Sequence, residues 1–207
     1  MGTPWLDIPL GDYEGHMALP SIGQAKMLAD HFERVITRYA PASVAVIGCA
    51  GGNGLERIDP DRIGRVVAVD VNPEYIKQTG SRHSHRLKGL ELHCADVQSD
   101  SLEFEPVELM YAALLFEYVD VALALRSLKR NCRSGTILVT VLQLKNQGQE
   151  TVSPSPFKSL GALAPAISLL APEDLRRSAV AQGFIPTESE LIESPSGKQF
   201  CVQVLGA

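Results

Sequence analysis

Apolar positions in the N-terminal part of the chain follow a helical period. Ser21 suits an N-cap, and apolar residues recur after it every three or four positions, which predicts a one-faced helix up to about Tyr39. These positions are Met27, Leu28, Phe32, Val35 and Ile36. Residues 1–20 contain three prolines and are predicted to be irregular.

Short apolar or β-branched runs replace this period from residue 43 onward. They predict strands, and they are SVAVIG (43–48), RVVAVD (65–70), LELHC (90–94), VELMYAAL (107–114) and GTILVTVL (135–142). Helical patterns separate them: a short one after Asn53, one from Pro73 to about Arg86, and one from Val119 to Arg130. This alternation of strand and helix predicts an α/β fold with a doubly wound, parallel sheet.

The C-terminal pattern differs. Pro172 suits the first turn of a helix and Gly183 suits its C-terminal cap. Two strand-like runs follow at 185–192 and 198–205, joined by a short turn, so the sheet is predicted to end in an antiparallel hairpin. Residues 143–171 show no clear period and form a long connection, of the kind that is usually functional or disordered.

Composition excludes several classes of protein. The 207 residues are 45% hydrophobic and 21% charged, as in a globular protein, and the net charge of -5 argues against a nucleic-acid-binding protein. The four cysteines form no CxxC pair, so reduced thiols are expected, without a disulfide framework or metal site. The start resembles no signal peptide, and no apolar stretch reaches the roughly 20 residues of a membrane span. A soluble, cytoplasmic protein is expected.

A glycine-rich loop follows the first predicted strand, and an acid ends the second. The small residues from Gly48 to Gly54 let the backbone approach a ligand, and Asp70, placed at the end of RVVAVD, suits ribose hydroxyls. Together they favour a nucleoside site. The alternatives are a plain tight turn and an acid that caps the helix at Pro73. A nicotinamide-dependent oxidoreductase would use the same features, but Ala50 and Asn53 stand where the dinucleotide fingerprint GxGxxG needs glycine.

In this order, the motifs resemble the class I S-adenosylmethionine-dependent methyltransferases. The matching segments are IGCAGGNG (47–54), VVAVDVNPEYI (66–76), LHCADV (92–97), LLFEYVD (114–120), LKRNCRSGTILV (128–139) and the GF pair at 183–184. The resemblance implies a Rossmann-like sheet of seven strands, mostly parallel with an antiparallel C-terminal strand. It also implies a cap segment and helix over 1–42, and a cofactor-binding methyltransferase domain over 43–207 with an insertion at about 143–171.

The resemblance also assigns roles within the cofactor site. It implies that the glycine loop lines the methionine and ribose, through Gly48, Cys49, Ala50, Gly52 and Asn53. Asp70 would bind the ribose hydroxyls, with Val71, Asp96 and Val97 around the adenine, and Ala112 and Ala113 near the sulfonium. Asp96 is alternatively a plain loop residue.

Two positions depart from the family pattern. Ala50 replaces the middle glycine of the first motif, and Val46 replaces the acid usual two residues before the first glycine. Ala50 adds a methyl group where the backbone must approach the ligand, and the missing acid at Val46 puts the affinity and the contacts of the methionine amino group in doubt. These departures also motivate a second alternative, a domain that binds the cofactor only to regulate or scaffold a partner.

Candidates for the acceptor side come from the N-terminal segment and from the end of the fourth strand. Tyr13 suits a ring near the sulfonium, His16 suits a general base, and Glu117 suits a place facing the pocket. The alternative is that Tyr13 and His16 only fix their segment to the domain, and that Glu117 caps a helix. A small molecule is the expected acceptor. Apolar residues within 157–170 suit either a partly hydrophobic acceptor or a homodimer contact.

Overall fold

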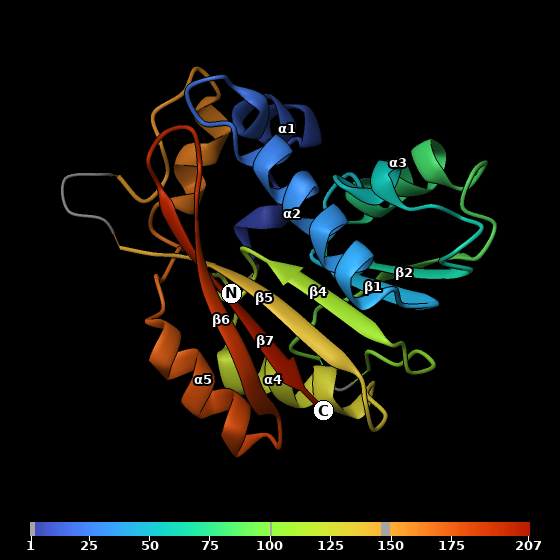
Figure 1. Ribbon diagram of the computed structural model, residues 1–207. Coiled ribbons are helices and arrows are strands. Elements are labelled where there is room, and N and C mark those ends of the chain that lie inside the picture. The colour runs from blue at the N-terminus through green and yellow to red at the C-terminus, as the bar shows by residue number, and fades with distance from the viewer. Residues whose placement is uncertain (1–2, 100, 146–149) are drawn as a thin grey trace.

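The computed structural model describes residues 3–99, 101–145 and 150–207, which form one seven-stranded sheet with helices on both faces (Figure 1). The strands are β1 (Ser43–Ile47), β2 (Arg65–Asp70), β3 (Leu90–Cys94), β4 (Leu109–Ala113), β5 (Ile137–Gln143), β6 (Ile185–Glu193) and β7 (Gln199–Gly206). Their order across the sheet is β3-β2-β1-β4-β5-β7-β6. Each predicted strand is therefore present.

The sheet is parallel except at its C-terminal end. β1 pairs in parallel with β2 and β4, while β7 lies antiparallel between β5 and β6. The turn between β6 and β7 is closed by hydrogen bonds from Ser194 N to Lys198 O (2.9 Å) and from Gly197 N to Ser194 O (2.9 Å). The predicted Rossmann-like sheet with an antiparallel C-terminal strand is confirmed.

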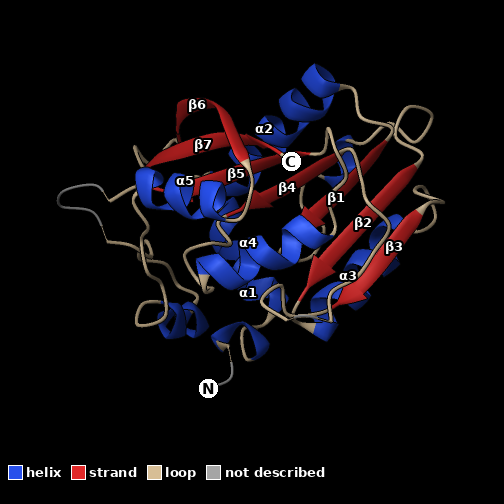
Figure 2. Ribbon diagram, turned by 90° about the horizontal axis from the view of Figure 1, so that it is seen from below, coloured by secondary structure: helices blue, strands red, loops and turns tan. Residues whose placement is uncertain are grey.

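Strand residues alternate between two separate cores. In β1, Val44 and Val46 face the core beneath α2 (Gln24–Tyr39) and α3 (Pro73–His83), whereas Ala45 and Ile47 face the core beneath α4 (Val121–Arg130) and α5 (Pro172–Ala181). Figure 2 shows the second of these faces, with α4 and α5 in front of the sheet. Because both faces are covered, the central strands are apolar throughout.

The first prediction that proves wrong concerns the N-terminal segment. Residues 1–20 are not irregular, because α1 spans Leu10–Ala18 after Pro9 in its N-cap position. The next helix, α2, starts at Gln24 behind Gly23 (φ 62°), and Ser21 is not its cap. The prolines that suggested irregular structure precede or follow α1 and do not interrupt it.

Two connections contain less helix than a doubly wound sheet usually has. Between β1 and β2 there is only the 3-10 helix η2, Leu55–Arg57. Between β3 and β4, the described residues contain no helix. The buried Asn131 fixes this second connection, since its Nδ2 donates to Leu102 O (3.0 Å) and its Oδ1 accepts from Phe104 N (2.8 Å).

The long segment after β5 lies beside the N-terminal segment at one end of the sheet (Figure 1). Its 3-10 helix η3 (Lys158–Leu163) contributes Leu160 and Leu163 to a small cluster with Ile8. The hydroxyl of Ser159 lies 2.6 Å from the carboxylate of Asp12 in α1. These two segments form one covering over the carboxyl ends of the strands.

The structure also bears on the expectations about membrane spans and cysteines. In the described residues, no helix is both long and apolar enough to cross a membrane. Cys49, Cys94, Cys132 and Cys201 are free thiols.

Asn131→Ala is expected to lower the free energy of unfolding by about 2–4 kcal/mol, because it leaves buried backbone groups of residues 102 and 104 without partners. Urea unfolding measures this change. Asn53→Ala is the matched control, since Asn53 is exposed and its side chain makes one hydrogen bond, to Ala25 O. A loss for Asn131→Ala no larger than that of the control would contradict the assignment.

Candidate functional site

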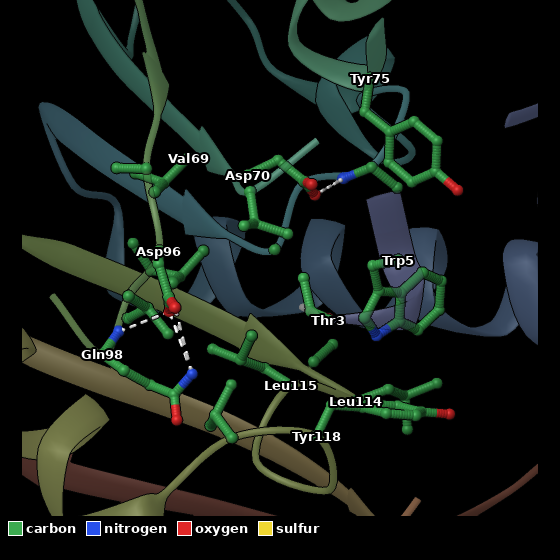
Figure 3. A pocket seen from close by; sticks show the side chains of 18 of the residues that line it. Thr3, Trp5, Val69, Asp70, Tyr75, Asp96, Gln98, Leu114, Leu115 and Tyr118 are labelled. Carbon is green, nitrogen blue, oxygen red and sulfur yellow. Dashed lines mark hydrogen bonds between the residues drawn. The ribbon is translucent and has the colours of Figure 1, made fainter. Parts of the chain in front are cut away.

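A cleft opens where the parallel strands end. It is lined from the ends of β1, β2, β3 and β4, and its empty space is about 730 Å³, part of it open to solvent. The chain leaves β1 and β4 in opposite directions across the sheet, and this switch in strand order is where ligands bind in open α/β sheets. Figure 3 shows the side chains that line the cleft.

The glycine loop turns sharply as it leaves β1. The amides of Gly48 and Cys49 both donate to Val69 O, at 2.8 and 3.0 Å, which ties the loop to β2. Gly48, Gly52 and Gly54 have φ values of 73°, 86° and 92°, in the region that favours glycine. Ala50 also has a positive φ, of 48°, and this conformation costs an alanine roughly 1–2 kcal/mol.

Asp70 holds the loop in this conformation. Its carboxylate accepts from Ala50 N (2.8 Å) and from Asn72 N (2.9 Å), and the residue is 8% exposed. Burial raises the pKa of Asp70, and the two amides oppose that rise. Asp70 lines the cleft, and in the described part of the chain no cationic side chain pairs with its carboxylate.

Asp96 lies on the rim of the cleft, across from Asp70 (Figure 3). Its Oδ1 accepts from the amide of Gln98 (2.9 Å) and from the Gln98 side chain (3.1 Å). Asp96 is exposed, whereas Val97 is buried and forms part of the wall with Val71. The rim therefore pairs an accessible acceptor with apolar surface, an arrangement that suits the edge and face of a planar base.

The N-terminal segment closes over the cleft. Thr3 and Trp5 line it, and Trp5 O accepts a hydrogen bond from Asn72 Nδ2 (2.8 Å). The Tyr75 hydroxyl donates to Ile8 O (2.9 Å). Farther along α1, Glu14 pairs with Arg82 of α3. Three contacts to one helix and its cap thus hold this segment against the cleft.

A second cavity of about 540 Å³, also partly open to solvent, adjoins the first. Four residues are common to the linings of both cavities: Trp5, Tyr13, Leu114 and Tyr118. The Trp5 ring packs edge-on against Tyr13 and Tyr118, with centroid distances of 5.4 and 5.0 Å. Leu114 has a φ of 54°, so a strained residue stands at this boundary.

Glu117 contributes a buried carboxyl group to the second cavity. Its Oε1 accepts from Gln143 N (2.7 Å), while its Oε2 is buried and has no partner. Burial raises the pKa of Glu117 to about 7. This carboxyl group can therefore exchange a proton near neutral pH.

His16 and Tyr13 project from α1 toward the same cavity. The Nδ1 of His16 is buried without a hydrogen-bond partner, and burial together with the nearby Lys198 lowers its pKa, which keeps the ring neutral. Burial and the charge of Asp70 raise the pKa of Tyr13, so its phenol stays protonated. The three acceptor-side candidates, Tyr13, His16 and Glu117, thus line one cavity.

The cofactor-side candidates divide into two groups. Seven line the first cleft: Gly48, Ala50, Asp70, Val71, Asp96, Val97 and Ala113. Four lie outside its lining: Cys49 and Ala112 are buried in the two cores, and Gly52 and Asn53 border a surface groove beside α3.

Several lining residues were not predicted as site residues from the sequence. They are Thr3, Trp5, Tyr75, Gln98, Leu114 and Leu115 in the first cleft, and Gln24 and Lys198 in the second cavity. Their segments meet only after folding. For Tyr75, Leu114 and Leu115 a signal was available, because they lie within the segments VVAVDVNPEYI (66–76) and LLFEYVD (114–120) that resemble the family motifs.

Comparisons with known proteins agree with this geometry. Residues 45–140 match the family model of a methyltransferase domain. Among curated proteins, none matches the sequence significantly.

Solved structures are similar in fold at low sequence identity. The N-methyltransferase NodS from Bradyrhizobium japonicum, in complex with S-adenosyl-L-homocysteine, has 16% identity and a TM-score of 0.65, over 87% of this chain and 86% of its own. The magnesium protoporphyrin IX methyltransferase from Synechocystis, also with S-adenosylhomocysteine, has 13% identity and a TM-score of 0.65, over 90% and 84%. The [4+2]-cyclase SpnF has 13% identity and a TM-score of 0.66, over 87% and 80%.

Ala50→Gly is expected to raise the free energy of unfolding by about 0.5–1 kcal/mol, because relief of the left-handed strain exceeds the added chain entropy. Urea unfolding gives the value. Ala40→Gly is the matched control, since Ala40 has a φ of 43° at the end of α2, away from the cleft. Stabilisation by the control alone would mean that the methyl group of Ala50 makes compensating contacts in the loop.

Proposed function

Because residues 45–140 match a methyltransferase domain and the motifs resemble those of the class I S-adenosylmethionine-dependent methyltransferases, we propose that the chain transfers the cofactor's methyl group to a small-molecule acceptor held in the second cavity. The observation that carries this proposal is the pair of joined cavities. One presents the fixed carboxylate of Asp70, and the other presents the unpartnered carboxyl oxygen of Glu117.

The first cleft fits the adenosine part of S-adenosylmethionine. Asp70 would accept hydrogen bonds from the ribose hydroxyls, since two amides fix its carboxylate and no cationic side chain of the described residues pairs with it. Asp96 would accept from the adenine amino group, with Val71 and Val97 against the ring. Gly48 and Ala50 border the path toward Ala113, where the sulfonium would lie. Val46 leaves the amino group of the methionine without the acid usual in this family.

The second cavity suits the acceptor for reasons of access and size. Four residues line both this cavity and the cofactor cleft, so an acceptor bound here would lie beside the methyl group of the cofactor. The ring of Tyr13 borders both spaces and is placed to attract a sulfonium through its face. The segment around η3 supplies apolar walls from Leu160, Leu163 and Ile167.

The cofactor supplies an electrophilic methyl group, so the protein's part is to align the acceptor and receive its proton. Glu117 suits this second task, because Oε1 is anchored by a backbone amide and Oε2 is free. Its pKa of about 7 matches the ideal for a base that works near neutrality. The neutral His16, with its unpartnered Nδ1, is the second proton acceptor in the cavity.

The remaining sequence predictions stay predictions. They are the cytoplasmic location, the absence of a nucleic-acid partner, the homodimer alternative, and the division into a cap over 1–42 and a domain over 43–207. No observation favours the nicotinamide-dependent oxidoreductase. The fold shared with a cyclase keeps one rival testable, a protein that binds the cofactor without transferring its methyl group.

Asp70→Asn is expected to weaken binding of S-adenosylhomocysteine by about 10- to 100-fold, because hydrogen bonds to a charged acceptor are lost. Isothermal titration calorimetry measures the affinity. Asp59→Asn is the matched control, since Asp59 is an exposed turn residue outside the cleft. Absence of binding by the unmodified protein would refute the proposed function, and equal affinities of the two variants would refute the role of Asp70.

Glu117→Gln is expected to remove a pH-dependent loss of stability. The pKa of Glu117 lies near 7 in the folded protein against an ordinary 4.5, so folding favours the protonated form. Its stabilising contribution is complete below pH 4.5, declines as the pH rises, and is lost above about 7. Relative to the variant, the wild type should therefore lose up to roughly 3 kcal/mol between pH 5 and 8.

Urea unfolding at a series of pH values tests this expectation. His16 titrates in the opposite sense, since its pKa is lowered, but it is present in both proteins and cancels in the comparison. Parallel stability profiles for wild type and variant would contradict a raised pKa of Glu117.

A further inference from the structure

The second cavity contains a lysine without an acidic partner. Lys198 stands just before β7, and only 5% of the residue is exposed. Its Nζ donates to Thr151 O (2.7 Å) and lines the cavity. Within the described residues, no carboxylate lies within ion-pair distance of this ammonium group, although the exposed Glu150 is near enough to favour its charged form.

This arrangement is unfavourable for an unliganded protein. A buried ammonium group loses much of its hydration, and one carbonyl oxygen satisfies only one of its three donors. Burial accordingly lowers the pKa of Lys198. Thr151 O is also shared, because it accepts a second hydrogen bond from Gln143 Nε2 (2.9 Å). An anion in the cavity would supply what these groups lack.

Other polar side chains in the cavity are also incompletely bonded. Gln24 is 5% exposed and forms no side-chain hydrogen bond with the described part of the chain. His16 Nδ1 and Glu117 Oε2 are buried and unpartnered. Three separate segments therefore bring incompletely bonded side chains to the lining of one cavity, which indicates a built binding site.

Two separate charged groups line the cavity. Lys198 lies near His16, since its charge lowers the pKa of that ring, whereas its ammonium group lies beyond ion-pair distance of the Glu117 carboxyl group. A ligand that spans the cavity would thus present an anion to Lys198 and a proton-donating group to Glu117. The same cavity also has apolar walls, with Met17, Leu160 and Leu163.

We propose that the acceptor is a small organic carboxylate with an apolar body, which binds its carboxylate at Lys198 and presents a hydroxyl or amino group to Glu117. This inference rests on the proposed function, since it names the class of molecule that the second cavity takes. Lys198 acts in specificity, while Glu117 receives the proton that the hydroxyl or amino group releases.

The test compares carboxylate probes with their neutral amides. The probes are 4-hydroxybenzoate, 8-hydroxyoctanoate and 8-aminooctanoate, each titrated beside the corresponding primary amide into protein saturated with S-adenosylhomocysteine. Calorimetry measures affinity. Trp5, the single tryptophan of the chain, lines both cavities and gives a second readout by fluorescence with the aliphatic probes.

At least one carboxylate is expected to bind about tenfold or more tightly than its amide. Lys198→Met should abolish this preference, and Lys198→Arg should retain part of it. Lys158→Met is the matched control, because Lys158 is exposed on η3, and it should leave the preference unchanged.

Affinity for S-adenosylhomocysteine should be equal in all these variants, which separates this inference from the proposed function. A protein that fails to bind S-adenosylhomocysteine overturns the proposed function. If the protein binds S-adenosylhomocysteine but prefers none of the carboxylates to its amide, only the present inference is overturned. The same holds if the Lys198→Met variant keeps the preference.

Discussion

The carboxylate of Asp70 is the point on which the site depends. It accepts from the amides of Ala50 and Asn72, and so joins the glycine loop to the end of β2. Asn72 extends this link, because its Oδ1 caps α3 through Glu74 N (2.9 Å) and its Nδ2 binds Trp5 O. One buried acid therefore positions the loop, the helix and the segment that covers the cleft. The cost of burying it is offset by two amides in place of a cation, which leaves it free to bind hydroxyl groups.

Strain is concentrated along the same edge of the sheet. Ala50 and Leu114 adopt left-handed conformations where the chain leaves β1 and β4, on either side of the switch in strand order. Such conformations persist only when the surrounding structure holds them, and here hydrogen bonds to Asp70 and to Val141 O do so. The result is a backbone that approaches a ligand closely on both sides of the cleft.

The two cavities divide the chemistry between them. The described lining of the first holds two carboxylates, uncharged polar groups and apolar surface but no cationic side chain, which suits a nucleoside with hydroxyl and amino donors. The second offers a carboxyl group with a pKa of about 7, a neutral imidazole and a desolvated ammonium group. The rings of Trp5, Tyr13 and Tyr118 pack together at the boundary between them, and this apolar surface favours the exclusion of water there.

How much could be predicted depended on the range of the interactions involved. The strands, the C-terminal hairpin, the glycine loop and Asp70 follow from local patterns, because a buried strand and a tight turn constrain residues that are close in sequence. The helix α1 was missed because the sequence alone does not show whether Pro9 and Pro20 flank a helix or prevent one. Cys49 and Asn53 share the loop with Gly48, yet the turn directs them away from the cleft. Trp5, Gln24 and Lys198 line the site only because distant segments meet at one edge of the sheet. By itself the sequence determined the sheet and the place of the Asp70 carboxylate at the end of β2. Only the tertiary structure decided which buried polar groups lack hydrogen-bond partners, because the partners of such a group can come from any segment that packs around it.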